Sequence, residues 1–273
     1  MLSCITVKII TTFGLMISRN KMQYVISLQR KKVRDSERLY IIEGDKIVKE
    51  YLMAGKRVAS LIGKPGFIDS LPSDLLKSTD EIIPVSYDEL RKISTLSTPH
   101  NALALIPMPE DEPDQDLLGS GLGVALDFIQ DPGNLGTIIR AAAWFGISNI
   151  ICSKNCVDVY NPKVIQASMG AMLNVRVHYL DLENVLENAC AGGVTVYAAL
   201  LEGTSIYTSE PGNSGIILLG NESRGISDEL MKYVTVKLVI PKFTAAEYGI
   251  DSLNAGMAAS IIFSEFARRN YSK

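Results

Sequence analysis

The sequence predicts an α/β protein of two domains, in which a small α/β domain precedes a larger domain built on a parallel sheet. Two observations lead to this prediction. After residue 121, apolar strand patterns alternate with helical patterns, as is typical of a parallel sheet with helices on both faces. The segment 107–121 is acidic, contains prolines and ends in glycines, so we interpret it as the connection between the domains. A chain of 273 residues, 47% of them hydrophobic, is long enough to bury two cores.

The first domain, expected over 16–107, contains short helical and strand patterns with recognisable ends. Apolar residues recur at helical spacing within 45–54, and Gly55 follows them as a helix stop. Ser86 and Glu89 form a capping box that predicts the start of another helix. The predicted elements are a helix over 17–30, a strand over 39–42, a helix over 45–54, a strand over 58–62, a short helix after 86 and a strand over 102–106.

The segments on either side of this domain are expected to lie outside the folded cores. Residues 1–15 are apolar and rich in threonine, but the run is too short to cross a membrane, so we expect a disordered or extended leader. Met16 is an alternative start. The linker between the domains is assigned to 108–120.

The second domain, expected over 121–273, is predicted to contain five strands and five helices in alternation. The strands are expected near 122–128, 148–152, 194–199, 215–219 and 234–240, and the helices near 134–145, 161–170, 181–191, 227–232 and 253–269.

The most informative segment is the junction between the first of these strands and its helix. An apolar strand runs into a polar turn, and Asn134 can cap the helix that we expect to begin near Leu135. Arg140 lies six residues further along, in an otherwise apolar helix, where burying a charge is costly unless an anion pairs with it. Taken alone, Asn134 could be an ordinary cap and Arg140 an ordinary surface cation.

Two later strands also end in small and polar residues. The strand near 215–219 ends in Gly220, Asn221 and Glu222, and the strand near 234–240 leads to a helix that begins near Ser252 and Asn254. Ligands bind at the carboxyl ends of the strands in open α/β sheets, so these three junctions predict one site.

These segments resemble the three signature motifs of the SpoU (TrmH-like) RNA 2′-O-ribose methyltransferases, members of the SPOUT superfamily. The order, the spacing and the strand-then-helix context agree with that family. The first motif is matched by Asn134, Gly136 and Arg140, the second by Leu219, Gly220, Asn221, Glu222 and Gly225, and the third by Ile240, Pro241, Ser252, Leu253 and Asn254. Upstream, Lys32, Arg34, Leu39, Glu43 and Gly44 resemble the start of the small RNA-binding domain that often precedes the catalytic one.

The resemblance implies a fold, a cofactor and partners. It implies a SPOUT parallel-sheet domain whose C-terminal segment forms a trefoil knot, although ordinary topology rules argue against knots. It also implies a homodimer that binds S-adenosylmethionine and methylates RNA, with ribosomal RNA favoured over transfer RNA as the substrate. A sulfonium supplies its own electrophile, so no metal is expected. Four cysteines do not form a disulfide scaffold in a chain of this length, so the composition predicts a cytoplasmic protein. The cofactor is expected to contact Leu200, Gly220, Ile240 and Leu253. The loop 242–251 is longer than the turn we associate with the third motif, so the cover over the cofactor can differ.

For the chemistry, the resemblance gives Arg140 the central role. Arginine stays protonated, so we expect Arg140 to hold the target phosphate and to stabilise the developing alkoxide; acting as a base would require a phosphate to relay the proton. Asn134 and Asn254 are expected to orient these groups, and Ser252 to position the ribose or Arg140. Glu222 is expected to anchor its neighbours, with a general base as the alternative.

RNA contact is expected from a cluster of basic residues in the small domain. The net charge of −3 argues against a protein that coats nucleic acid nonspecifically, but a net charge hides local patches. Arg30, Lys31, Lys32 and Arg34 form such a patch, and the alternative is a solvated helix face. The resemblance favours RNA.

Three alternatives remain from the residues themselves. The first is an NAD-dependent Rossmann oxidoreductase, suggested by the glycines of 119–123, although they precede a strand instead of following it. The second is a catalytically inactive RNA-binding relative, which would have no need of the five catalytic candidates in combination. The third is a metal pair at Cys152 and Cys156; Cys4 and Cys190 are distant in sequence, so only His100 and His178 could complete the ligand set.

Overall fold

The computed structural model describes residues 8–9, 17–109, 121–243 and 252–271. By their contacts the residues form two compact units, Met1–Glu112 with Tyr160–Gln166, and Pro113–Val159 with Ala167–Lys273. The expected leader and linker lie largely outside the described residues. Within the leader, Lys8–Ile9 form strand β1, which is parallel to β4, so these two residues are extended and paired in a sheet.

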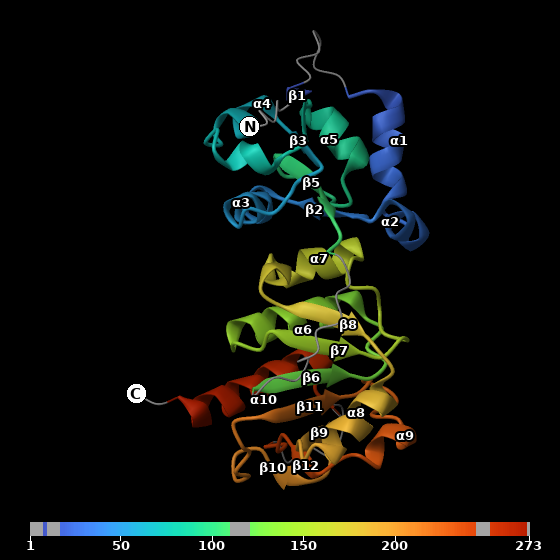
Figure 1. Cartoon of the computed structure of the whole chain (residues 1–273), viewed down its shortest axis with the longest axis vertical. Helices are drawn as coiled ribbons and strands as arrows, with labels where there is room; N and C mark the ends of the chain where they lie inside the picture. Colours follow the sequence, from blue (N-terminus) through green and yellow to red (C-terminus); the bar gives the residue numbers. More distant parts are fainter. Residues whose placement is uncertain (1–7, 10–16, 110–120, 244–251, 272–273) are drawn as a thin grey trace, which may run out of the picture. The chain divides into compact units, whose positions relative to one another are not determined.

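The first unit contains a five-stranded sheet in the order β1-β4-β3-β5-β2, with helices packed against it (Figure 1). Strand β5 runs antiparallel to both β2 and β3, whereas β3 and β4 are parallel. The elements are α1 (Arg19–Ser27), α2 (Lys31–Glu37), β2 (Leu39–Glu43), α3 (Asp45–Met53), β3 (Ser60–Gly63), α4 (Pro65–Asp69), a 3-10 turn (Leu75–Ser78), β4 (Glu81–Pro84), α5 (Tyr87–Ile93) and β5 (Ala102–Pro107).

Local sequence signals explain where several of these helices begin and which side they bury. Ser86 and Glu89 form both bonds of the predicted capping box at the start of α5. Helix α3 buries its predicted apolar face and ends before Gly55, which has a positive φ of 65°. These predictions are confirmed.

The helix expected over 17–30 is present as α1, but it ends three residues early, at Ser27, and α2 follows from Lys31 as a helix that was not predicted. The reason lies in Arg34 of α2. Its guanidinium donates hydrogen bonds to the carbonyl oxygens of Leu28 (3.1 Å) and Gln29 (2.7 Å), at the end of α1. Carbonyl groups at a helix C-terminus lack partners within the helix, so the arginine satisfies them and fixes the turn.

The second unit contains a parallel sheet in the order β10-β12-β9-β11-β6-β7-β8. The predicted α/β class and parallel sheet are confirmed. The elements are β6 (Leu122–Leu126), α6 (Pro132–Trp144), β7 (Asn149–Cys152), a 3-10 turn (Ala171–Leu173), β8 (Arg176–Tyr179), α8 (Leu182–Ala191), β9 (Val196–Leu200), β10 (Thr204–Ser205), β11 (Gly215–Leu219), α9 (Asp228–Met231), β12 (Val236–Val239) and α10 (Ala255–Asn270). Helix α7 (Pro162–Ser168) begins within Tyr160–Gln166, which the contacts assign to the first unit, and ends in the second.

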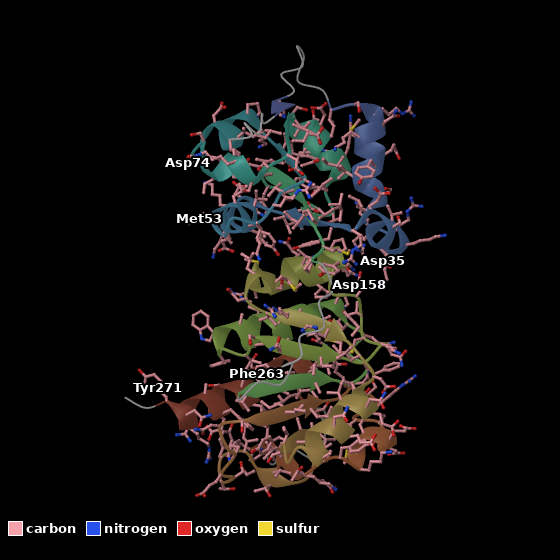
Figure 2. The ribbon with its side chains drawn as sticks, in the orientation of Figure 1. Asp35, Met53, Asp74, Asp158, Phe263 and Tyr271 are labelled. Atoms are coloured by element: carbon pink, nitrogen blue, oxygen red, sulfur yellow. The ribbon has the colours of Figure 1, made fainter. Side chains whose placement is uncertain are left out.

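Successive residues of a strand point to opposite faces of the sheet, so apolar strands expose apolar side chains on both faces. Helices cover both of these faces. One face buries Ala125, Ile151 and Leu218 against α8 and α9. Helices α6 and α10 pack against each other on the other face, where Tyr197 of β9 meets Phe266 of α10 edge to face at 5.1 Å. Phe263 is fully buried on α10 (Figure 2).

Two strands of this sheet were absent from the prediction. Strand β8 is an edge strand whose four residues, RVHY, are exposed or half-buried, so it lacks the apolar run that marks a central strand. Strand β10 has only two residues and depends on pairing with β12. Neither carries enough sequence pattern to be recognised alone.

Candidate active site

The junctions that follow β6 and β11 lie side by side. The two strands are neighbours in the parallel sheet and pair from Gly215 with Leu122 to Leu219 with Leu126. The chain continues from β6 to β7 on one side of this pair and from β11 to β12 on the other side, which makes the pair a switch point of the sheet. Ligands bind outside the strand carboxyl ends at such a point.

Helix α6 begins earlier than the sequence suggested. Its N-cap is Asp131, whose carboxylate accepts the backbone N–H of Asn134 at 2.8 Å, and Pro132 occupies the first turn. The expectation that Asn134 caps the helix was therefore wrong, because aspartate followed by proline is itself a strong helix start. The Asn134 side chain is thereby available for other contacts.

Side chains from the three motifs form one hydrogen-bonded chain. The Asn254 amide donates to Oδ1 of Asn134 at 2.7 Å, and the Asn134 amide donates to the Glu222 carboxylate. Asn254 is also the N-cap of α10, because its Oδ1 accepts the N–H of Met257 at 3.2 Å. Three of the five predicted catalytic residues, separated by up to 120 positions in the chain, are thus brought together.

Asn221 builds the loop that carries Glu222. Its side-chain oxygen accepts the N–H groups of Ser223 (2.9 Å) and Arg224 (3.1 Å), and its amide donates to the carbonyl oxygen of Phe128 at 3.0 Å. The backbones of Asn221 and Gly225 close the loop with two hydrogen bonds. Sequence reasoning placed Asn221 in the motif but missed this structural role.

Asp127 is a second residue that sequence reasoning missed. Its carboxylate is 7% exposed and accepts the N–H of Ser227 at 2.9 Å, which ties the end of β6 to the start of α9. A buried carboxylate needs such donors to compensate for lost hydration. The available signal was a single acidic residue directly after a buried apolar strand.

Arg140 is exposed on α6, contrary to the expectation of a costly buried charge. The stripe of α6 that faces solvent also carries Thr137 and Trp144, which are spaced as helix neighbours. Within 17–109, 121–243 and 252–271, no hydrogen bond or ion pair involves the Arg140 guanidinium or the exposed Ser252 hydroxyl. The structure therefore does not bring these two candidates into the Asn134 chain.

The predicted cofactor contacts lie at adjacent strand ends. Leu200 ends β9, Gly220 follows β11 and Ile240 follows β12, and β9 pairs with both β11 and β12. Leu253 precedes α10 and is exposed, while the other three are half-buried. Most of the long loop 242–251 is outside the described residues.

Among the glycines of the described residues, Gly220 has the closest backbone neighbours at the position of a Cβ. A Cβ at this position would meet the carbonyl group of Gly225 and lie 2.5 Å from the backbone nitrogen of Ile226. Only a residue without a Cβ fits there. The glycine therefore lets the loop that carries Glu222 pack directly on the end of β11.

Cys152 and Cys156 support the turn behind the first motif. Cys156 Sγ accepts the N–H of Ile129 at 3.2 Å and lies 3.3 Å from the carbonyl oxygen of Leu126. Hydrogen bonding from Cys152 lowers the pKa of Cys156 to about 7, and the same interaction with burial raises the pKa of Cys152. No group of three or more metal-ligating side chains occurs in the described parts of the chain.

The basic cluster of the first unit is smaller than predicted. Arg34 is 2% exposed and bonds to the end of α1, so the expectation that it contacts RNA was wrong. Arg30, Lys31 and Lys32 are exposed, and Lys31 pairs with Asp35 at 2.7 Å, one turn along α2.

Family models match almost the whole described chain. The model of the SpoU rRNA Methylase family matches residues 121–264, and that of an MRM3-like substrate binding domain matches residues 19–104. One relative is the Bacillus subtilis 23S rRNA (guanosine(2553)-2′-O)-methyltransferase RlmP, 29% identical, aligned over 86% of this chain and 91% of its own. The human mitochondrial rRNA methyltransferase 3 is 24% identical over 89% of this chain and 70% of its own.

Solved structures agree with these matches. A protein assigned to the TrmH family of RNA methyltransferases from Porphyromonas gingivalis is 36% identical, with a TM-score of 0.80 over 93% of this chain and 99% of that one. An AdoMet-bound rRNA methyltransferase from Sinorhizobium meliloti is 26% identical, with a TM-score of 0.81 over 95% of this chain and 98% of that one. The chain therefore belongs to the SpoU rRNA Methylase family.

Proposed function

We propose that this protein transfers a methyl group from S-adenosylmethionine to a ribose 2′-hydroxyl of ribosomal RNA. The observation that carries the proposal is the hydrogen-bonded chain of Asn254, Asn134 and Glu222, which joins all three motifs at one edge of the sheet. The names of the relatives, RNA 2′-O-methyltransferases among them, support both the reaction and ribosomal RNA over transfer RNA.

The alternatives lack support. Gly123 lies inside β6, so the glycines of 119–123 do not follow a strand as a dinucleotide fingerprint requires. The relatives and solved structures are RNA methyltransferases, which favours neither an oxidoreductase nor an inactive binder.

The cofactor is proposed to lie against Leu200, Gly220, Ile240 and Leu253. When bound, S-adenosylmethionine supplies a methyl group on a sulfonium, an electrophile that needs no metal. The protein must then align the ribose hydroxyl and help to remove its proton. The compact backbone at Gly220 and the adjacent strand ends support this placement.

Arg140 is proposed to grip the phosphate beside the target ribose and to stabilise the alkoxide as it forms. Its exposure leaves the guanidinium free to meet a polyanion, and its planar fork can contact a phosphate oxygen and a ribose oxygen together. Glu222 acts as an anchor, because its carboxylate already accepts the Asn134 amide. Asn134 and Asn254 orient the reacting groups, and Ser252 positions the ribose or Arg140.

The proposal includes a homodimer with the active site near its interface. Trp144 of α6 is 83% exposed and Met257 of α10 is 57% exposed, and these two helices pack side by side. Large exposed apolar side chains on adjacent helices are typical of a surface that a second copy covers. A chain that light scattering finds monomeric would remove this part of the proposal.

The remaining parts of the proposal concern the chain as a whole. We infer a C-terminal trefoil knot, supported by the likeness to SpoU structures. The domains are proposed as 16–107 for RNA binding, 108–120 as linker and 121–273 for catalysis, with a cytoplasmic location. Among the described residues, the structure has no helix of the length and apolarity that crossing a membrane requires.

The first test is methyl transfer itself. Purified protein, tritiated S-adenosylmethionine and an unmodified 23S ribosomal RNA transcript should yield labelled RNA, and an equal mass of transfer RNA should yield far less. Labelling of transfer RNA alone would overturn the choice of substrate. Absence of labelling in both, with tight binding of NAD instead, would overturn the reaction.

The basic cluster provides a separate prediction for RNA binding. Replacing Arg30, Lys31 and Lys32 by alanine should weaken RNA binding and flatten its salt dependence, because each lost phosphate contact lowers the slope of log K against log salt by about 0.7 to 0.9. A filter-binding series from low to high salt measures this slope. The matched control replaces three exposed cations elsewhere in the same unit, Lys46, Arg57 and Lys77, and should leave the slope near that of the parent. Equal slopes in both triple variants would make the cluster an ordinary solvated face.

A further inference from the structure

Phe128, the second residue after β6, has a backbone conformation that is unusual for its type. Its φ is +59°, in the left-handed region, where a bulky side chain costs free energy that glycine would not incur. The surrounding turn holds it there. Its N–H donates to Ser153 Oγ and its carbonyl oxygen accepts the Asn221 amide, both at 3.0 Å. Strain of this kind is retained mainly at functional sites.

The ring of Phe128 lies beneath Arg224. The guanidinium carbon of Arg224 is 4.8 Å from the ring centroid, within the range of a cation–π contact. The Arg224 side chain is exposed, and no described residue accepts a hydrogen bond from its guanidinium. Its backbone position is fixed by Asn221, which accepts its N–H at 3.1 Å. The pair therefore presents an ordered guanidinium, stacked on one face and open on the other.

This pair adjoins the proposed catalytic chain. Asn221 bonds to Phe128 and is followed directly by Glu222, whose carboxylate accepts the Asn134 amide. The contacts thus run from the Arg224 and Phe128 pair through one residue to the place where the target ribose is expected.

We propose that Phe128 and Arg224 form a platform that binds an unpaired nucleotide of the RNA next to the methylated ribose. This inference rests on the proposed function. RNA is read mainly where bases are unstacked, and such bases stack on aromatic rings and on arginine planes. The open face of the guanidinium accepts the base, and its N–H groups meet the adjacent phosphate. The ring keeps the guanidinium in position, which explains why an aromatic side chain occupies a strained backbone site.

The test compares three variants in RNA binding and methyl transfer with a 23S ribosomal RNA transcript. Arg224→Ala should raise the dissociation constant for RNA and the KM roughly tenfold, the scale of one lost base-stacking contact, and should change kcat less. Arg224→Lys should recover part of the binding, because it keeps the charge and loses the plane. Phe128→Gly should lose binding like Arg224→Ala, although glycine suits the positive φ. Affinity for S-adenosylhomocysteine and the melting temperature of the Arg224 variants should match the parent.

A matched control and separate readouts keep the outcomes distinct. Lys232→Ala removes an exposed cation from the same unit, where it pairs with Glu183, and should bind RNA like the parent. Parent-like RNA binding by Arg224→Ala and Phe128→Gly would overturn the platform, as would an equal loss of S-adenosylhomocysteine affinity, which would indicate a purely structural loop. A parent protein that binds RNA without transferring methyl would instead contradict the proposed function, and the binding ratios would still decide the platform.

Discussion

Replacing Arg140 by alanine is expected to slow methyl transfer by about a hundredfold, a loss of roughly 3 kcal/mol of transition-state stabilisation. This is the scale of removing one donor that stabilises developing charge. This substitution should affect catalysis without affecting folding, because Arg140 is exposed on α6 and no described residue pairs with it. Alanine also favours the helix. The melting temperature should therefore stay close to that of the parent.

Arg140→Lys distinguishes the guanidinium from a simple positive charge. Lysine keeps the charge but cannot contact a phosphate oxygen and a ribose oxygen with one planar group, so it should be nearly as slow as alanine. Single-turnover methyl transfer measures the chemical step, and calorimetry with S-adenosylhomocysteine checks the cofactor site. Retained activity in Arg140→Ala, or a loss explained by unfolding or by falling to monomers in light scattering, would make Arg140 a structural residue.

Replacing Gly220 by alanine is expected to have the largest effect on the cofactor site. The added methyl group would overlap the Gly225 carbonyl group and lie 2.5 Å from the Ile226 nitrogen, so backbone atoms would have to move. Overpacking of this kind costs about 2 to 3 kcal/mol, which lowers the melting temperature by roughly 5 to 10 °C. Since the loop carries Glu222, S-adenosylhomocysteine affinity should fall at least tenfold and activity should fall with it.

The matched control for this variant is Gly121→Ala. Gly121 precedes β6, and a Cβ there meets nothing within 4 Å. This control should keep the parent melting temperature and S-adenosylhomocysteine affinity. Parent-like cofactor binding by Gly220→Ala would show that the loop can relax, and it would remove Gly220 from the proposed cofactor site.

The sequence predicted the α/β class and the three strand-to-helix junctions from which hydrogen bonds join Asn134, Glu222 and Asn254, because these junctions depend on local apolar runs followed by polar turns. It also predicted the capping box at Ser86, which depends on neighbouring residues alone. Predictions of side-chain roles failed where a hydrogen-bond partner a few residues away decides the outcome. Arg34 is buried because it donates hydrogen bonds to the carbonyl oxygens of Leu28 and Gln29. Asp131, and not Asn134, is the N-cap of α6.

Other features could not have been predicted from single residues. The exposure of Arg140 depends on which side of α6 faces the sheet, and the apolar neighbours of Arg140 in sequence suggested burial. The left-handed backbone of Phe128 follows from bonds to Ser153 and Asn221, which are 25 and 93 positions away. Strand β8 is an edge strand whose residues carry no clear strand pattern.

The central claim is that the joined motifs methylate a ribose 2′-hydroxyl, and the position of the transferred methyl group tests it most directly. RNA labelled by the parent protein from tritiated S-adenosylmethionine is hydrolysed in alkali, which cleaves a linkage only where the 2′-hydroxyl is free. The account predicts that the label is recovered in one alkali-resistant dinucleotide from 23S ribosomal RNA, and that Arg140→Ala yields about a hundredth of it in the same time. Label recovered in mononucleotides, which places the methyl group on a base, would contradict the account.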